Sequence, residues 1–70
     1  MLIFQEKLLL DGILLEIALH DDFRYRLRYG ELVEYENGKR RVRGRVRPYV
    51  LRSVEQLRYD FEQDVAAQVA

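Results

Sequence analysis

The chain has 70 residues, and its 12 basic and 12 acidic side chains give a formal net charge of zero at pH 7. A dedicated nucleic-acid binder usually carries a clear basic excess, so this balance counts against that class. The chain has no cysteine, which excludes disulfides and cysteine-ligated metals, and no apolar run nears the roughly 20 residues that span a bilayer. We therefore expect one cytoplasmic domain over residues 1–70 that makes no membrane contact.

Two tight turns organise the first two thirds of the chain. Asp11-Gly12 and Asn37-Gly38 favour type I′ hairpin turns, which need positive φ at both central positions. Three-residue connections at 20–22 and 30–32 would join the remaining strands. The predicted strands are, in order, 3–10, 13–19, 23–29, 33–36 and 39–47. The sequence thus predicts a five-stranded antiparallel meander over about residues 2–47.

The strand register can be tested on charge, because a one-residue slip would exchange the two faces of a strand. The predicted turns place Leu15 opposite Leu27 and Leu27 opposite Tyr35, all on an apolar face. On the other face, one row reads Lys7, Glu16, Arg26, Glu36 and Lys39, and the next reads Leu9, Leu14, Arg28, Glu34 and Arg41. Opposite charges alternate along these rows, which supports the register.

Arginines recur with strand periodicity in two segments. Arg24, Arg26 and Arg28 share one face of strand 23–29, and Arg41, Arg43, Arg45 and Arg47 share one face of strand 39–47. The structural interpretation is a charge ladder, in which glutamates neutralise Arg26, Arg28 and Arg41. Arg43, Arg45 and Arg47 extend beyond the short strand before them and find no acidic partner in this register. Together with Arg24, they are the candidates for contact with an anion or RNA.

A helix is predicted at the C-terminal end. Pro48 ends the last strand and opens a connector over 48–52. Ser53-Val54-Glu55-Gln56 forms a capping-box motif that starts a helix over about 53–68. Its apolar stripe consists of Val54, Leu57, Phe61 and Val65. The fold class is therefore α+β, with one C-terminal helix packed on the apolar face of the sheet.

One helix is narrower than five strands, because it covers about 10 Å of a sheet roughly 24 Å wide. We therefore expect part of the aromatic face to stay exposed and to bind a second copy or an obligate partner. The interface candidates are Phe23, Tyr25, Tyr29 and Tyr35.

Catalytic chemistry has little support in the sequence. His20 is the single histidine and stands beside Asp21 and Asp22, which together make an incomplete metal-ligand set. The chain has no phosphate-binding glycine loop and no serine–histidine–aspartate set, since Ser53 serves as a helix cap. We expect no metal and no cofactor, and the catalytic residues are unknown. Enzyme activity stays open, and the enzyme class to test first is a ribonuclease.

Several segments carry a family resemblance. They are the opening LLLDGILLEI, the strand with Phe23, Tyr25 and Arg26, the turn Tyr35-Glu36-Asn37, and a tail with Pro48-Tyr49, Ser53 to Leu57, Asp60-Phe61 and Asp64-Val65. In these segments the chain resembles the small TumE-type toxins of toxin–antitoxin systems. That family tends to carry histidines between the turn and the Pro-Tyr pair, where this chain reads GKRRVRGRVR. The resemblance therefore carries over no catalytic residue.

Two hypotheses of function follow. The first is a small cytoplasmic toxin–antitoxin-type protein that acts through protein contacts and through RNA contacts at its arginine-rich strand. Its partner would be a small antitoxin-like protein or a second copy. The alternative is a non-catalytic, dimeric protein-interaction module whose open sheet face is its whole function.

Overall fold

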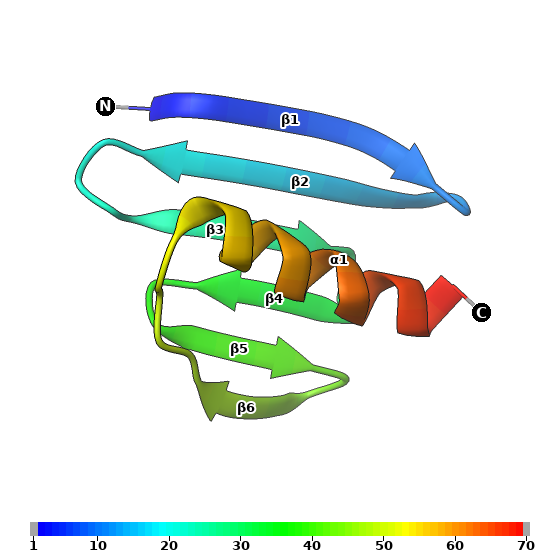
Figure 1. Cartoon of the computed structure of the whole chain (residues 1–70). Coiled ribbons are helices and arrows are strands. Elements are labelled where there is room, and N and C mark those ends of the chain that lie inside the picture. Colours follow the sequence, from blue (N-terminus) through cyan, green and yellow to red (C-terminus); the bar gives the residue numbers. More distant parts are fainter. Residues whose placement is uncertain (1, 70) are drawn as a thin grey trace.

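The computed structural model of the chain describes residues 2–69 and forms a sheet with one helix across it (Figure 1). The elements are β1 (Leu2–Leu10), β2 (Ile13–His20), β3 (Tyr25–Tyr29), β4 (Val33–Glu36), β5 (Lys39–Val42), β6 (Arg45–Pro48) and α1 (Val54–Val69). The sheet is an antiparallel meander in the order β1-β2-β3-β4-β5-β6. The predicted α+β class is confirmed. The predicted strand number is wrong, because the segment 39–47 folds back on itself and makes two strands.

The tight turns explain this strand order. Asp11-Gly12 and Asn37-Gly38 adopt left-handed backbone conformations, with φ of 55° and 77° in the first turn and 42° and 88° in the second. Both predicted hairpins are thus confirmed. Arg43-Gly44 does the same, with φ of 50° and 81°, and this third two-residue turn separates β5 from β6.

The predicted register is confirmed at three of the four predicted strand pairs. Lys7 lies opposite Glu16, Arg26 opposite Glu36, and Glu36 opposite Lys39. The β2–β3 pairing is wrong by two residues, because the connection covers four residues rather than three and Glu16 lies opposite Arg28. The observed charged row is Lys7, Glu16, Arg28, Glu34 and Arg41. A two-residue slip keeps every side chain on its predicted face.

Helix α1 lies over β3 and β4 and closes the core (Figure 1). Leu57, Phe61 and Val65 are buried, as their spacing predicts, whereas Val54 stays exposed. The core consists of Leu15, Ile17, Leu19, Tyr25, Leu27, Tyr29, Val33, Tyr35, Leu57, Phe61 and Val65. Among the described residues, no helix has the length and apolar character needed to cross a membrane.

The helix start confirms half of the predicted capping box. The Gln56 backbone N–H donates to Ser53 Oγ at 3.1 Å, which satisfies one of the free donors of the first turn. The Gln56 side chain does not reach back to Ser53. Its amide donates instead to Asp60 Oδ1 at 2.8 Å, one turn further along α1.

Candidate anion-binding site at the β5–β6 hairpin

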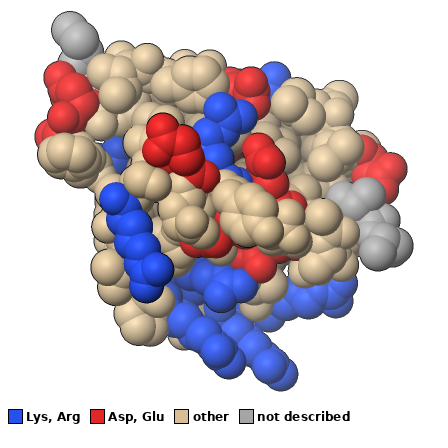
Figure 2. Space-filling view, viewed as in Figure 1, with Lys and Arg blue, Asp and Glu red and all other residues tan. Residues whose placement is uncertain are grey.

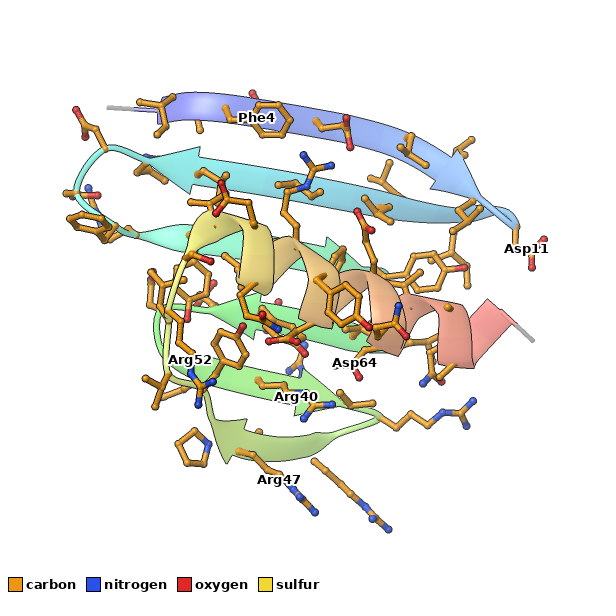
Figure 3. All side chains as sticks on the ribbon, viewed as in Figure 1. Phe4, Asp11, Arg40, Arg47, Arg52 and Asp64 are labelled. Atoms are coloured by element: carbon orange, nitrogen blue, oxygen red, sulfur yellow. The ribbon has the colours of Figure 1, made fainter. Side chains whose placement is uncertain are left out.

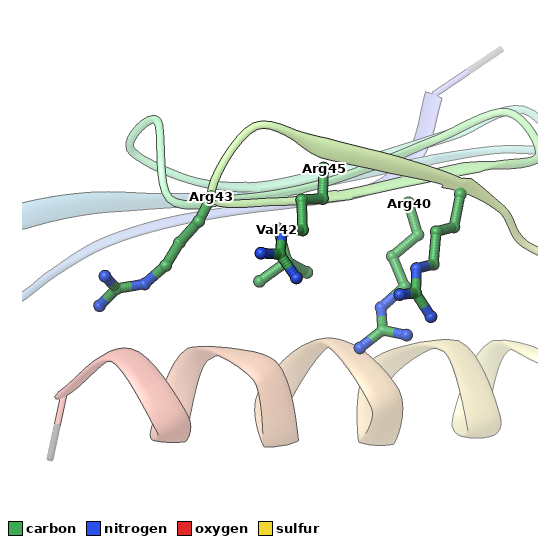
Figure 4. A pocket seen from close by; sticks show the side chains of 5 residues that line it. Arg40, Val42, Arg43 and Arg45 are labelled. Atoms are coloured by element: carbon green, nitrogen blue, oxygen red, sulfur yellow. The ribbon is translucent and has the colours of Figure 1, made fainter.

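Arginines from both strands of the β5–β6 hairpin meet on the side of the sheet that faces the helix. The register pairs Arg40 with Arg47 and Val42 with Arg45, so these side chains share one face. We call Arg40, Arg43, Arg45 and Arg47 the arginine cluster. With Val42, they line one pocket at the edge of the sheet (Figure 4). The structure thus brings together the three predicted residues of this segment and adds Arg40, which lies opposite Tyr35 on the same face of the sheet.

The arrangement differs from the predicted stripe. We expected Arg41, Arg43, Arg45 and Arg47 on one face of one long strand. The turn at Arg43-Gly44 breaks that alternation and moves Arg45 and Arg47 to the helix side. Arg41 stays on the other face, where it pairs with Glu34 at 3.2 Å. The sequence did hold a signal for this turn, because glycine stands second in it as in Asp11-Gly12 and Asn37-Gly38.

Arg40 is the neutralised member of the cluster. Its Nε and Nη2 donate to Asp64 of α1 at 2.8 and 2.7 Å. The Tyr35 hydroxyl donates to the same carboxylate. Burial, together with this hydrogen bond to Asp64, raises the pKa of Tyr35 above its ordinary value. Arg40 therefore joins the sheet to the helix more than it offers charge to a ligand.

The other cluster members are open to solvent. The guanidinium of Arg43 donates to the side chain of Gln68, which is uncharged. Arg45 and Arg47 are exposed, and neither forms an ion pair or hydrogen bond with another described side chain. Figure 2 shows Lys and Arg side chains gathered beside a more acidic surface, and Arg47 extends outward from β6 in Figure 3. The zero net charge of the chain thus hides a local excess of positive charge.

A second polar link stands beside the cluster. The Tyr49 hydroxyl donates to Asp60 Oδ2 at 2.6 Å, and the rings of Tyr35 and Tyr49 meet edge to face with centroids 4.9 Å apart. Burial, with the hydrogen bond to Asp60, raises the pKa of Tyr49. Asp60 and Asp64, one turn apart on α1, were missed from sequence because nothing showed which tyrosines they would meet.

Arg24 does not join the cluster. It lies in the β2–β3 connection, and its Nε contacts Asp22 Oδ2 at 2.7 Å. Its surroundings are His20, Tyr25, Arg26, Glu36 and Asn37, a separate pocket at the opposite end of β5 from Arg43. Arg24 therefore forms an ion pair within the β2–β3 connection and is not part of the arginine cluster.

The charge ladder on the other face of the sheet is confirmed in part. Arg26 contacts Glu34 at 3.7 Å and Glu36 at 3.3 Å, and Glu34 also contacts Arg41. Arg28 differs from the prediction, because its Nε donates to the backbone oxygen of Gly30 at 3.1 Å and no ion pair with a described carboxylate forms. These arginines therefore contact groups of the sheet and its turns.

The predicted exposed aromatic face is wrong for its tyrosines. Tyr25, Tyr29 and Tyr35 are buried, because the helix lies directly over the strands that carry them. Their hydroxyls are used internally: Tyr29 donates to the Leu10 carbonyl at 2.9 Å, and the Gly38 backbone N–H donates to Tyr25 at 2.8 Å. Of the four interface candidates only Phe23 is exposed, at 81%.

The described residues hold no metal site, and the arginine cluster carries no acid–base group. No three His, Asp or Glu side chains of residues 2–69 lie close enough together to hold a metal ion. Arginine stays protonated at any ordinary pH and presents five donors in a fixed fork. The arginine cluster can therefore bind and orient an anion, and it cannot move a proton.

Comparison with known proteins gives no relative. No family model, no curated protein and no solved structure matches this chain.

Proposed function

We propose that this chain is a small toxin–antitoxin-type protein that binds the phosphate backbone of RNA through its arginine cluster. The observation that carries the proposal is that four arginines line one pocket, with Arg45 and Arg47 free of carboxylate partners among the described residues. A cytoplasmic location would suit this role.

The geometry of the two free arginines suits a polyanion better than one small anion. Arg45 and Arg47 stand two residues apart on one face of β6. Such positions are about 6.6 Å apart along a strand, so each guanidinium can take a different phosphate. Arginine binds phosphate through two parallel N–H donors, which favours it over lysine for this contact.

The toxin–antitoxin context comes from the sequence resemblance to TumE-type toxins. The segment that differs from the family pattern, residues 38–47, carries the whole arginine cluster. We propose binding rather than cleavage, because the cluster holds no group that titrates near neutral pH. The lone histidine, His20, belongs to the pocket of Arg24. A ribonuclease activity would need residues beyond this cluster.

The test is RNA binding against salt concentration, followed by fluorescence anisotropy of a labelled single-stranded RNA. The double variant Arg45→Ala/Arg47→Ala should weaken binding about tenfold or more at low salt. It should also reduce the slope of log K against log salt by about 1.4, because single strands lose roughly 0.7 per phosphate contact.

The matched control is Arg26→Ala/Arg41→Ala, which removes the same net charge from the other face of the sheet, where both arginines are ion-paired. Its slope should stay near that of the wild type. Equal losses in the two double variants would show that only net charge matters, and the hairpin would not be the site. Release of cleaved RNA by the purified protein would replace the binding role with a nuclease.

A dimeric interaction module is the second candidate, and a specific observation favours it. Exposed apolar side chains gather on β1, where Leu9 is 72% and Ile3 60% exposed. Soluble monomers rarely leave such a surface uncovered. This candidate differs from the first in its surface, since β1 and β6 lie at opposite edges of the sheet.

A further inference from the structure

The two edges of the sheet are built differently. β6 presents Arg45 and Arg47 and ends in Pro48, and both charge and proline discourage pairing with another strand. β1 is nine residues long and is exposed along nearly its whole length. Six of its residues are large and apolar: Leu2, Ile3, Phe4, Leu8, Leu9 and Leu10. Within residues 2–69, no other strand or helix lies beyond β1 at this edge (Figure 1).

The exposed apolar surface lies on both faces of the β1–β2 hairpin. Leu8 and Leu10 face the helix side, whereas Leu9 and Leu14 face away from it, and all four are exposed. A monomeric sheet normally keeps one face polar. The whole chain exposes 5027 Å². A monomer of 8.4 kDa exposes about 4600 Å². The exposed area is thus about 400 Å² above that expectation, as an uncovered apolar edge would make it.

The order of residues in β1 indicates that the partner of this exposed strand is a second copy of the chain. The strand reads as three apolar residues, three polar ones (Gln5, Glu6 and Lys7) and three apolar ones. This polarity pattern is the same in both directions, with Glu6 at its centre. Two antiparallel copies centred on Glu6 therefore set apolar against apolar and polar against polar. Phe4 would lie opposite Leu8 of the second copy.

The direction of the free backbone groups of β1 agrees with a strand pairing centred on Glu6. In a two-residue hairpin the pair next to the turn, Leu10 and Ile13, exchanges hydrogen bonds. Bonded pairs then alternate along the ladder as far as Phe4, beyond which the register of β1 shifts. Leu14 fits this pattern, because its carbonyl faces away from β1 and accepts from the N–H of Gly30, the residue after β3, at 3.0 Å. The N–H and C=O groups of Gln5 and Lys7 consequently point outward. They are the groups that a strand centred on Glu6 would use.

We infer that β1 pairs antiparallel with β1 of a second copy, centred on Glu6, to form a homodimer with one continuous sheet. The two central carboxylates face each other, and Arg58 of each copy, 4.0 Å from its own Glu6, offsets their repulsion. The formal net charge of zero adds no long-range repulsion between copies. Both arginine clusters remain at the outer edges, so the inference stands independently of RNA binding.

Light scattering coupled to size-exclusion chromatography tests the assembly. The wild type should elute with twice the mass of one 8.4 kDa chain. Leu9→Lys should yield the mass of one chain, because it places a charge within the new interface and leaves the core of its own copy intact. Val46→Lys is the matched control: Val46 is 61% exposed at the opposite edge, and this variant should remain dimeric.

A cross-link tests the register, because the chain has no cysteine of its own. Residues opposite each other in a non-hydrogen-bonded pair have Cα atoms about 4.5 Å apart, within disulfide reach. Glu6→Cys should therefore form a covalent dimer under mild oxidation. Leu9→Cys should not, since the two positions would be about 20 Å apart.

Three outcomes would overturn the inference. They are a monomeric wild type at micromolar concentration, a Leu9→Lys variant that is folded by circular dichroism yet still dimeric, and equal cross-linking of the two cysteine variants. In any of them RNA binding at β6 could persist. Conversely, a failure to bind RNA would leave the mass measured by light scattering unchanged.

Discussion

Arg40 of β5 and Asp64 of α1 form a two-point ion pair, with both guanidinium contacts shorter than 3 Å. Figure 3 shows the two side chains meeting between the sheet and the helix. Asp64 also accepts from the Tyr35 hydroxyl, so one carboxylate fixes α1 against two adjacent strands. This contact sets both the stability of the helix on the sheet and the charge left over in the arginine cluster.

Asp64→Asn should lower the free energy of unfolding by about 1–2 kcal/mol, because a charge-assisted pair is lost while the half-exposed Arg40 can turn to water. Urea unfolding followed by circular dichroism measures this. Asp22→Asn is the control, since its pair with Arg24 is exposed on both sides. It should cost much less than Asp64→Asn, because solvent screens an exposed pair. Equal decreases in the free energy of unfolding would mean that the Asp64 contact stabilises the fold no more than the exposed Asp22 pair does.

The same Asp64→Asn variant should bind RNA better. Releasing Arg40 adds one free guanidinium to the cluster, so the salt slope should steepen by about 0.7. Anisotropy titrations of wild type and variant at several salt concentrations give the comparison. An unchanged slope would place Arg40 outside the RNA contact while leaving Arg45 and Arg47 in it.

Stability should fall at alkaline pH through Tyr35 and Tyr49. Burial and their aspartate partners raise the folded pKa of both hydroxyls above the unfolded value. Their contribution to stability is therefore fully present below about pH 10 and is lost as pH rises toward the folded pKa. Unfolding midpoints measured from pH 8 to 11 should decline steadily above pH 10.

Tyr35→Phe/Tyr49→Phe should flatten that decline. Tyr59→Phe is the control, because Tyr59 is exposed on α1 and its hydroxyl has no such partner among the described residues. A double variant with the same alkaline decline as wild type would assign the effect to other groups.

The sequence predicted those features of the fold that depend on local chemistry. Asp11-Gly12 and Asn37-Gly38 are strong turn signals, and Ser53 marks the helix start. It could not give the β2–β3 register, because the alternation of Tyr25, Leu27 and Tyr29 fits equally well after a slip of two residues. The length of the β2–β3 connection decided the register, and there Phe23 adopts a left-handed conformation (φ 66°) that its residue type does not suggest.

The candidate site shows the same division. Counting charges along the predicted strands identified Arg45 and Arg47 as unpaired, and no side chain within the described part of the chain pairs with either. Their position was not predictable, because the turn at Arg43 reverses the chain and moves them onto the helix side. Burial of the tyrosines was also mispredicted, since the width of a sheet says nothing of which strands a helix will cover.

Gly44→Ala should destabilise the protein by about 1 kcal/mol, since Gly44 has φ of 81° and a side chain there is strained. A Cβ at this position would meet nothing within 4 Å, so the loss would be purely conformational. For a chain of this size it corresponds to a fall of about 4–8 °C in Tm, measured by thermal melts. Arg43→Asn should leave Tm unchanged or raise it, because asparagine tolerates the left-handed conformation better.

Gly30→Ala gives the contrast that separates backbone strain from crowding. Its φ is 54°, and a Cβ there would lie 2.6 Å from Cγ2 of Ile13, so steric conflict adds to the conformational cost. Its Tm should therefore fall further than that of Gly44→Ala. The Gly44 turn places Arg45 and Arg47 on the helix side, and the Gly30 turn does not. At temperatures where both variants are folded, Gly44→Ala should therefore weaken RNA binding, whereas Gly30→Ala should leave it unchanged. The reverse order in binding would mean that the hairpin turn does not orient the arginine cluster.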